Sequence, residues 1–182
     1  MSDHPTATEI LAFWKEAGPK KWWSKDDALD AEIRERFFVR HAHAACGALD
    51  DWQDTPDGAL ALVLLLDQFS RNLFRETAHA WAFDAKGLAI AKRAIANGLD
   101  VEVDEELRSF IYLPFMHSEA LEDQRTCLHH MERFGGENNI KAAREHLEII
   151  ERFSRFPHRN DRLGRETTLE EKEFLDGGGF KG

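Results

Sequence analysis

The chain has 182 residues, of which 42% are hydrophobic and 32% are charged, and its formal net charge is −10. This length corresponds to about one domain, and the composition excludes wholesale disorder. The acidic balance disfavours nucleic acid as a partner. The two cysteines, Cys46 and Cys127, are too few for a disulfide framework or a four-cysteine zinc site.

Membrane insertion and secretion are also disfavoured. The longest unbroken apolar run is Ala59–Leu66, whereas a membrane-spanning helix needs about 20 apolar residues. The N-terminus, Met1–Pro5, lacks the basic start and the apolar stretch of a signal peptide. We therefore expect a cytoplasmic protein with no membrane partner, no nucleic-acid partner and no cofactor.

N-cap residues, glycines and prolines divide the chain into about eight expected helices, and no segment shows the alternation of a strand. Thr6 and Glu9 have the spacing of a capping box, as do Thr168 and Glu171. Further start signals are Ser24 with Asp27, Thr55-Pro56, Thr77 and Asp104. The expected helices cover 7–17, 25–46, 56 to at least 66, 78–97, 104–114, 119–134, 138–153 and a last short helix after 168.

Three further features complete the predicted fold. The segment Ala59–Leu66 is apolar on every side, which predicts a buried central helix. Pro114 lies late in its helix and should kink or end it. The glycines at 177–179 predict a flexible tail over 176–182. The sequence thus predicts one all-α domain spanning 1–182, built from helical hairpins.

A first polar cluster directly follows the apolar helix. It comprises Asp67, Gln68, Arg71, Asn72 and Arg75. If the helix continues, Asp67 and Arg71 are neighbours four residues apart, and so are Gln68 and Asn72. The cluster is either part of a ligand site or a hydrogen-bonded structural network at a buried helix end.

A second polar cluster follows Pro114. It comprises His117, Glu119, Asp123 and Gln124. Imidazole and carboxylates could hold a divalent ion, but the spacing matches no strong metal motif, so we expect no tightly held metal. The alternatives are acid–base chemistry by His117, Glu119 and Asp123, or ion pairs between these carboxylates and arginines from elsewhere in the chain.

A third cluster is rich in arginine and contains aromatic residues. Phe153, Phe156 and Pro157 should anchor this segment to the core. The polar members are Arg155, His158, Arg159, Asn160 and Arg165. Because arginine matches carboxylate and phosphate geometry, the cluster is typical of an anion site, and the alternative is a set of structural ion pairs.

The same segments carry a resemblance to a known family. The matching stretches are Phe13-Trp14, Trp22-Trp23, LDQFSRNLFR at 66–75, YLPFMHSE at 112–119, Asp123-Gln124, FPHRN at 156–160 and Leu163-Gly164-Arg165. In this order they resemble a bacterial family of unknown function, number 924 among such domains, grouped with tetratricopeptide-like helical folds. The resemblance implies a right-handed array of antiparallel helix pairs and supplies candidate positions, but no reaction.

Three hypotheses for function follow. The first is a pocket for a small anionic molecule, with Asp67, Arg71, the 117–123 segment and the 155–159 segment converging. In that pocket His117 or His158 would be the general acid or base, and Glu119 or Asp123 would orient it. The second is a tetratricopeptide-like module that binds a protein partner. The third is that the polar clusters are purely structural. The sequence leaves open whether the protein is an enzyme.

Overall fold

The computed structural model describes residues 4–180, and within that span it contains helices and no strand. The predicted all-α fold is therefore confirmed. The described backbone falls into two compact units. The first unit comprises residues 4–75 and 79–114, and the second comprises 76–78 and 115–180.

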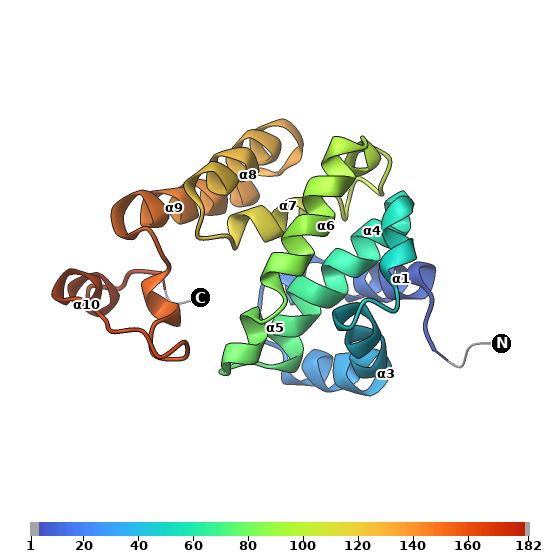
Figure 1. Cartoon of the computed structure of the whole chain (residues 1–182), viewed down its shortest axis with the longest axis horizontal. Helices are drawn as coiled ribbons and strands as arrows, with labels where there is room; N and C mark the ends of the chain where they lie inside the picture. Colours follow the sequence, from blue (N-terminus) through green and yellow to red (C-terminus); the bar gives the residue numbers. More distant parts are fainter. Residues whose placement is uncertain (1–3, 181–182) are drawn as a thin grey trace. The chain divides into compact units, whose positions relative to one another are not determined.

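The first unit contains the N-terminal helices (Figure 1). They are α1 (Ala7–Ala17), α2 (Pro19–Trp22), α3 (Asp27–Ala45), α4 (Pro56–Val63), α5 (Phe69–Leu73), α6 (Asp84–Ala96) and the part of α7 (Ser109–Met116) up to Pro114. Between them lie the short turns η1 (Asp50–Asp54), η3 (Ala78–Trp81) and η4 (Leu99–Val101), and a π-helical turn, η2 (Leu64–Gln68).

The centre of the first unit is the segment Ala59–Leu66, as predicted. Every side chain in it is at most 1% exposed. Helix α4 packs against α1 and α6, and η2 packs against α3 and α6. Because neighbours surround this segment, it needs no polar face, and each fully buried leucine or valine contributes roughly 1.5–3 kcal/mol.

Several expected helix starts are confirmed. The capping boxes Thr6–Glu9 and Thr168–Glu171 are both formed. The Thr55 side chain accepts a hydrogen bond from the backbone N–H of Gly58, with Pro56 at the first helical position. In each case the side chain satisfies a backbone donor that has no partner inside the helix.

Three expected starts are wrong. Asp26, not Ser24, caps α3, and its carboxylate accepts from the N–H groups of Ala28 and Leu29. Thr77 does not open a helix, since α6 begins only at Asp84 after the turn η3. Asp104 accepts from the N–H of Glu106 at 2.9 Å and so forms a local turn, while α7 begins at Ser109.

The second unit consists of helix α8 (Leu121–Phe134), α9 (Glu137–Phe153), the turn η5 (Pro157–Arg159) and α10 (Leu169–Asp176), together with the end of α7. Helices α8 and α9 are joined through Gly135-Gly136 and pack side by side as a hairpin (Figure 1). Buried Ile149, Ile150 and Phe156 form its core. One hairpin is the element of a tetratricopeptide-like array, and the array itself stays a prediction.

The described part of the tail predicted over 176–182 contacts two histidines of the second unit. The ring of Phe180 lies 4.6 Å from the His146 ring and 5.1 Å from the His158 ring, measured between centroids. An aromatic side chain at the end of the described chain thus packs on the second unit, and the flexibility of the tail stays a prediction. Residues 181 and 182 lie outside the described residues.

Candidate functional site

In the first unit, Arg71 is held between two carboxylates. Its Nη1 atom lies 2.6 Å from Asp67 Oδ1, as the four-residue spacing predicted. Its two terminal nitrogens donate to the two oxygens of Asp84, each at 3.1 Å. Burial lowers the pKa of Arg71, but the charges of Asp67 and Asp84 outweigh this effect, so the net pKa is raised. This arrangement is a buried ionic network whose positive charge is already neutralised.

The remaining members of the first cluster form a chain of hydrogen bonds that ends on Asp30. Gln68 Nε2 donates to Asn72 Oδ1 at 3.0 Å, which confirms their predicted proximity. Asn72 Nδ2 donates to Asp30 Oδ1 at 2.8 Å. Arg75 donates to both oxygens of Asp30. For this cluster the geometry favours a hydrogen-bonded structural network over a ligand site.

A histidine that the sequence analysis did not select lies under the same helix. His41 Nε2 is 2.8 Å from Ser70 Oγ, and the Ser70 hydroxyl donates to the carbonyl of Leu66 at 2.7 Å. Because that bond uses the hydroxyl proton, His41 Nε2 must be the donor toward Ser70. Burial lowers the pKa of His41 to about 4, so the ring is neutral at pH 7.

In the second unit, Glu119 and Arg165 form a bidentate ion pair. The Arg165 terminal nitrogens lie 2.8 and 3.1 Å from the two Glu119 oxygens. Glu119 also accepts from the backbone N–H of Phe156 at 2.8 Å, and Arg165 donates to the Phe156 carbonyl at 3.1 Å. Burial raises the pKa of Glu119, but Arg165 and the Phe156 N–H lower it more, so the carboxylate stays ionised. Of the two alternatives for Glu119, the ion pair with a distant arginine is therefore the one that this structure contains.

Gln124 and Asp123 stabilise the start of α8. Gln124 Nε2 donates to the backbone carbonyls of Phe115, Met116 and Ser118, at 3.3, 2.6 and 2.6 Å. The Ser118 hydroxyl donates to Asp123 Oδ2 at 2.7 Å. Both side chains therefore shape the turn between α7 and α8 and hold His117 and Glu119 at a fixed place in it.

Arg155 and Asn160 converge on Glu171 of α10. Arg155 donates to both Glu171 oxygens, at 2.5 and 2.7 Å, and Asn160 Nδ2 donates to one of them at 3.2 Å. The Glu171 side chain is only 3% exposed. Hydrogen bonds from Arg155, more than the opposing effect of burial, lower the pKa of Glu171 to about 2. Arg155 is thus a structural residue that fastens α10.

Two histidines and an arginine surround the ring of Phe156, and a third histidine lies beside one of them. We call this set the histidine cluster: His117, His146, His158 and Arg159. The rings of His146 and His158 lie 5.5 and 5.7 Å from the Phe156 ring. The His117 ring lies 6.4 Å from that of His146. The guanidinium of Arg159 lies 4.5 Å from the Phe156 centroid, in cation–π range.

The histidine cluster is electropositive around His158. Burial lowers the pKa of His158 most, and the charges of Arg159, His146 and His117 lower it further, to about 3, against a smaller raising effect of Glu119. His158 is half-buried, whereas Arg159 is 7% exposed. His158 is therefore neutral at pH 7, in a site where the charges that lower its pKa outweigh the one that raises it.

His146 is a member of this cluster that the sequence analysis missed. Its Nδ1 is 2.8 Å from the carbonyl of Ala142, and because a carbonyl only accepts, Nδ1 carries the proton. His146 lies on the buried stripe of α9 together with Ala143, Ile149 and Ile150. A histidine on an otherwise apolar helix face was the signal that could have identified it.

The predicted site residues thus separate into two groups. The second unit brings together His117, Glu119, His158, Arg159 and Arg165, while Asp67 and Arg71 belong to networks of the first unit. Their predicted convergence with the 117–123 segment therefore stays a prediction. Across residues 4–180, no three histidine, cysteine, aspartate or glutamate side chains are arranged to hold a metal ion.

Comparison with known proteins agrees with the resemblance seen in the sequence. A solved structure of a protein of unknown function from Agrobacterium tumefaciens is 47% identical to this chain, with a TM-score of 0.91. The match covers 94% of this chain and 97% of that protein. No curated protein matches the chain. In the described span, no helix combines the length and apolarity needed to cross a membrane. The model of the family described as "Bacterial protein of unknown function (DUF924)" matches residues 10–179, so the chain belongs to this family.

Proposed function

We propose that the second unit binds a small anionic molecule at the histidine cluster. The observation that carries this proposal is that His146, His158 and Arg159 surround the Phe156 ring, with His117 beside His146, in a chain whose net charge is −10. Carboxylates and phosphates are the anions that arginine and histidine recognise best.

Glu119, the carboxylate that raises the pKa of His158, is already engaged by other donors. Glu119 is engaged by both terminal nitrogens of Arg165 and by the N–H of Phe156. Its raising effect on the pKa of His158 is smaller than the lowering effects of Arg159, His146 and His117. A bound anion would add negative charge beside His158 and would raise its pKa toward neutrality.

The same electrostatics define what His158 would do for a ligand. In the free protein the ring is neutral and can donate one hydrogen bond and accept another. With an anion beside it, a higher pKa would let the ring exchange a proton with the ligand near neutral pH. The proposal therefore covers binding first, and general acid–base catalysis by His158 as its stronger form.

The test is an NMR titration of the histidine rings in the full chain, with inorganic phosphate and succinate as separate probes. We expect either anion to raise the pKa of His158 by one or more pH units and to raise the melting temperature. Arg159→Gln should weaken the effect about tenfold, because a buried charge-assisted hydrogen bond contributes on the order of 1.5–3 kcal/mol.

The matched control is Arg144→Gln. Arg144 also lies in the second unit, but it is exposed and pairs with Glu132 at 2.7 Å. This variant should respond to phosphate and succinate as the parent does. If neither anion moves the His158 resonances of the parent, or if both variants respond equally, the anion site does not exist.

A further inference from the structure

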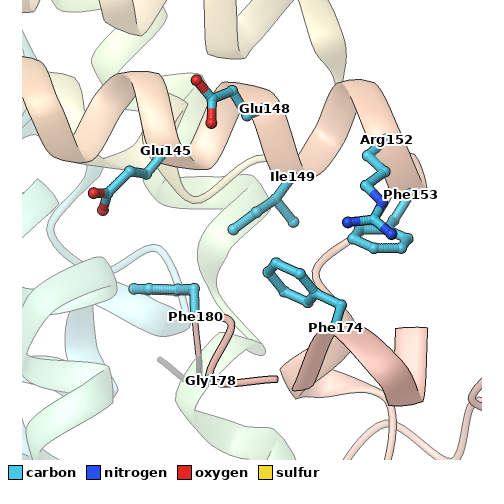
Figure 2. Close-up of a pocket in the computed structure, with 8 residues that line it drawn as sticks. All are labelled: Glu145, Glu148, Ile149, Arg152, Phe153, Phe174, Gly178 and Phe180. Carbon is cyan, nitrogen blue, oxygen red and sulfur yellow. The ribbon is translucent and has the colours of Figure 1, made fainter. Parts of the chain in front are cut away.

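A cavity of about 410 Å³ lies between α9 and the C-terminal segment of the second unit. Figure 2 shows its walls. Helix α9 contributes Glu145, Glu148, Ile149, Arg152 and Phe153, and the C-terminal segment contributes Phe174, Gly178 and Phe180. The α9 residues follow each other at intervals of three and one, so they lie on one face of the helix and form one wall. The volume is that of a small-molecule pocket.

The interior of this cavity is aromatic. Ile149, Phe153, Phe174 and Phe180 line it. The rings of Phe153 and Phe174 lie 5.1 Å apart between centroids, and Figure 2 shows Phe174 and Phe180 facing α9 from the opposite side. Such walls bind the apolar body of a ligand, and their faces attract cations.

Arg152 shows that these rings accept a cation. Its guanidinium carbon lies 4.6 Å from the Phe153 centroid and 5.8 Å from the Phe174 centroid. The charge of Arg152 is compensated, because its Nε donates to Glu170 at 2.9 Å. It therefore adds little net positive charge to the cavity.

The charge of the cavity is consequently negative. Glu145 and Glu148 are both exposed on its α9 side. Within residues 4–180, Glu145 forms a loose ion pair with Lys141, at 3.7 Å. Figure 2 shows Glu145 extending from α9 on the side of Phe180. An aromatic interior beside two carboxylates is complementary to an apolar molecule with a cationic end.

We propose that this cavity binds a primary amine with an apolar body, of about the size of a phenylethyl group. The apolar body lies between Phe174, Phe180 and Ile149, and the ammonium lies beside Glu145, with Glu148 adding to the negative field. The charge preference is opposite to that of the histidine cluster. This site therefore does not rest on the anion proposal, and either can fail without the other.

The test compares two probes of equal shape and opposite charge, 2-phenylethylamine and phenylacetate, by NMR shift titration of the full chain. We expect the amine to shift resonances of Phe174 and Gly178, which line the cavity, and phenylacetate to act on these two residues at least tenfold more weakly. Phe180 is left out of the readout because it also contacts the histidine cluster, where the proposed anion site would bind a carboxylate. Equal binding of both probes at Phe174 and Gly178, binding of phenylacetate alone there, or no binding of the amine would overturn the proposal.

Three variants locate the amine. Glu145→Gln should weaken binding of 2-phenylethylamine about two- to fivefold, the range of an exposed ion pair. Phe174→Leu keeps an apolar wall and should weaken it about threefold or more, since the ring face is lost. Glu151→Gln, on the same helix but outside the cavity, should leave binding unchanged. If Glu145→Gln and Glu151→Gln behave alike while circular dichroism shows both folded, the ammonium is not where we place it.

Discussion

His41 makes the stability of the first unit depend on pH. Its ring is 3% exposed, contacts the rings of Phe74 and Phe83, and donates to Ser70. The folded pKa of about 4 lies below the ordinary value of 6.5. Between these values the unfolded chain binds a proton that the folded chain does not bind, so stability must fall as the pH falls from 6.5 toward 4.

We expect this linkage to remove up to about 3 kcal/mol of the unfolding free energy, since one pKa unit corresponds to about 1.36 kcal/mol. Urea unfolding at pH 7 and pH 4.5 measures the loss. In His41→Gln the amide can still donate to Ser70 but cannot titrate, so the loss should be smaller than in the parent. Equal losses in both proteins would mean that His41 is not the titrating group.

Arg155 and His158 are three residues apart, yet their substitution should have different consequences. Arg155→Ala leaves the buried carboxylate of Glu171 without its bidentate partner. The melting temperature should fall by about 5 °C or more, because an uncompensated buried charge is costly. His158→Ala removes a half-buried neutral ring, so it should lower the melting temperature less while abolishing stabilisation by phosphate or succinate. Thermal unfolding of both variants with and without these anions checks the contrast, and equal, severe destabilisation by both variants would favour a purely structural cluster.

At the scale of elements, Gly58 shows a conflict between propensity and packing. Alanine is the better helix former by about 1 kcal/mol. A Cβ atom at Gly58, however, would lie 2.1 Å from the backbone carbonyl oxygen of Trp52, so the turn η1 or α4 would have to move. We expect Gly58→Ala to destabilise the protein by about 1–3 kcal/mol, the usual cost of overpacking.

Gly87 in α6 is the matched control for that substitution. A Cβ atom added at Gly87 would lie 3.7 Å from the Cβ atom of Leu66 and 3.9 Å from that of Asp67. Both distances are ordinary van der Waals contacts. Gly87→Ala should therefore be neutral or stabilising in the same urea unfolding experiment. Destabilisation by Gly87→Ala equal to that of Gly58→Ala would show that propensity and local contacts do not separate these sites.

The elements that the sequence predicted well are those whose signals are local. The Thr6 and Thr168 capping boxes and the apolar run 59–66 depend on residues within one helix turn or two. The helix start predicted at Thr77 was wrong, because the short turn η3 follows this residue and not a long helix. The π-helical turn η2 was not predicted, because the periodicity used to recognise helices assumes 3.6 residues per turn throughout.

In the candidate site, too, contacts within one helix could be predicted and contacts between distant segments could not. The Asp67–Arg71 pair could be predicted because both residues lie on one helix face. The partners of Glu119 and Glu171 are 46 and 16 residues away, so the sequence could indicate that arginines were needed but not which ones. The amine cavity was missed because its aromatic walls come from α9 and from a tail that glycine predicted to be flexible.

For the whole molecule, the prediction of a single domain can be tested with probes that the chain already carries. All five tryptophans, at positions 14, 22, 23, 52 and 81, belong to the first unit. Cys127 belongs to the second unit and is fully buried. Burial raises the pKa of its thiol to about 12, so it is unreactive until this unit opens. Tryptophan fluorescence therefore reports unfolding of one unit, and thiol labelling reports opening of the other.

If the chain is one cooperative domain, the two probes must give the same transition in urea, because two-state unfolding has no populated intermediate. The experiment uses Cys46→Ser, which removes the exposed cysteine and leaves Cys127 as the thiol that is labelled by a short pulse of reagent. We expect the midpoints of fluorescence and labelling to agree within experimental error. Labelling of Cys127 at a urea concentration at which the tryptophans are still native would mean that the second unit unfolds by itself. Binding of either probe ligand should then raise the labelling midpoint alone, since both proposed sites lie in that unit and a ligand stabilises the state that binds it.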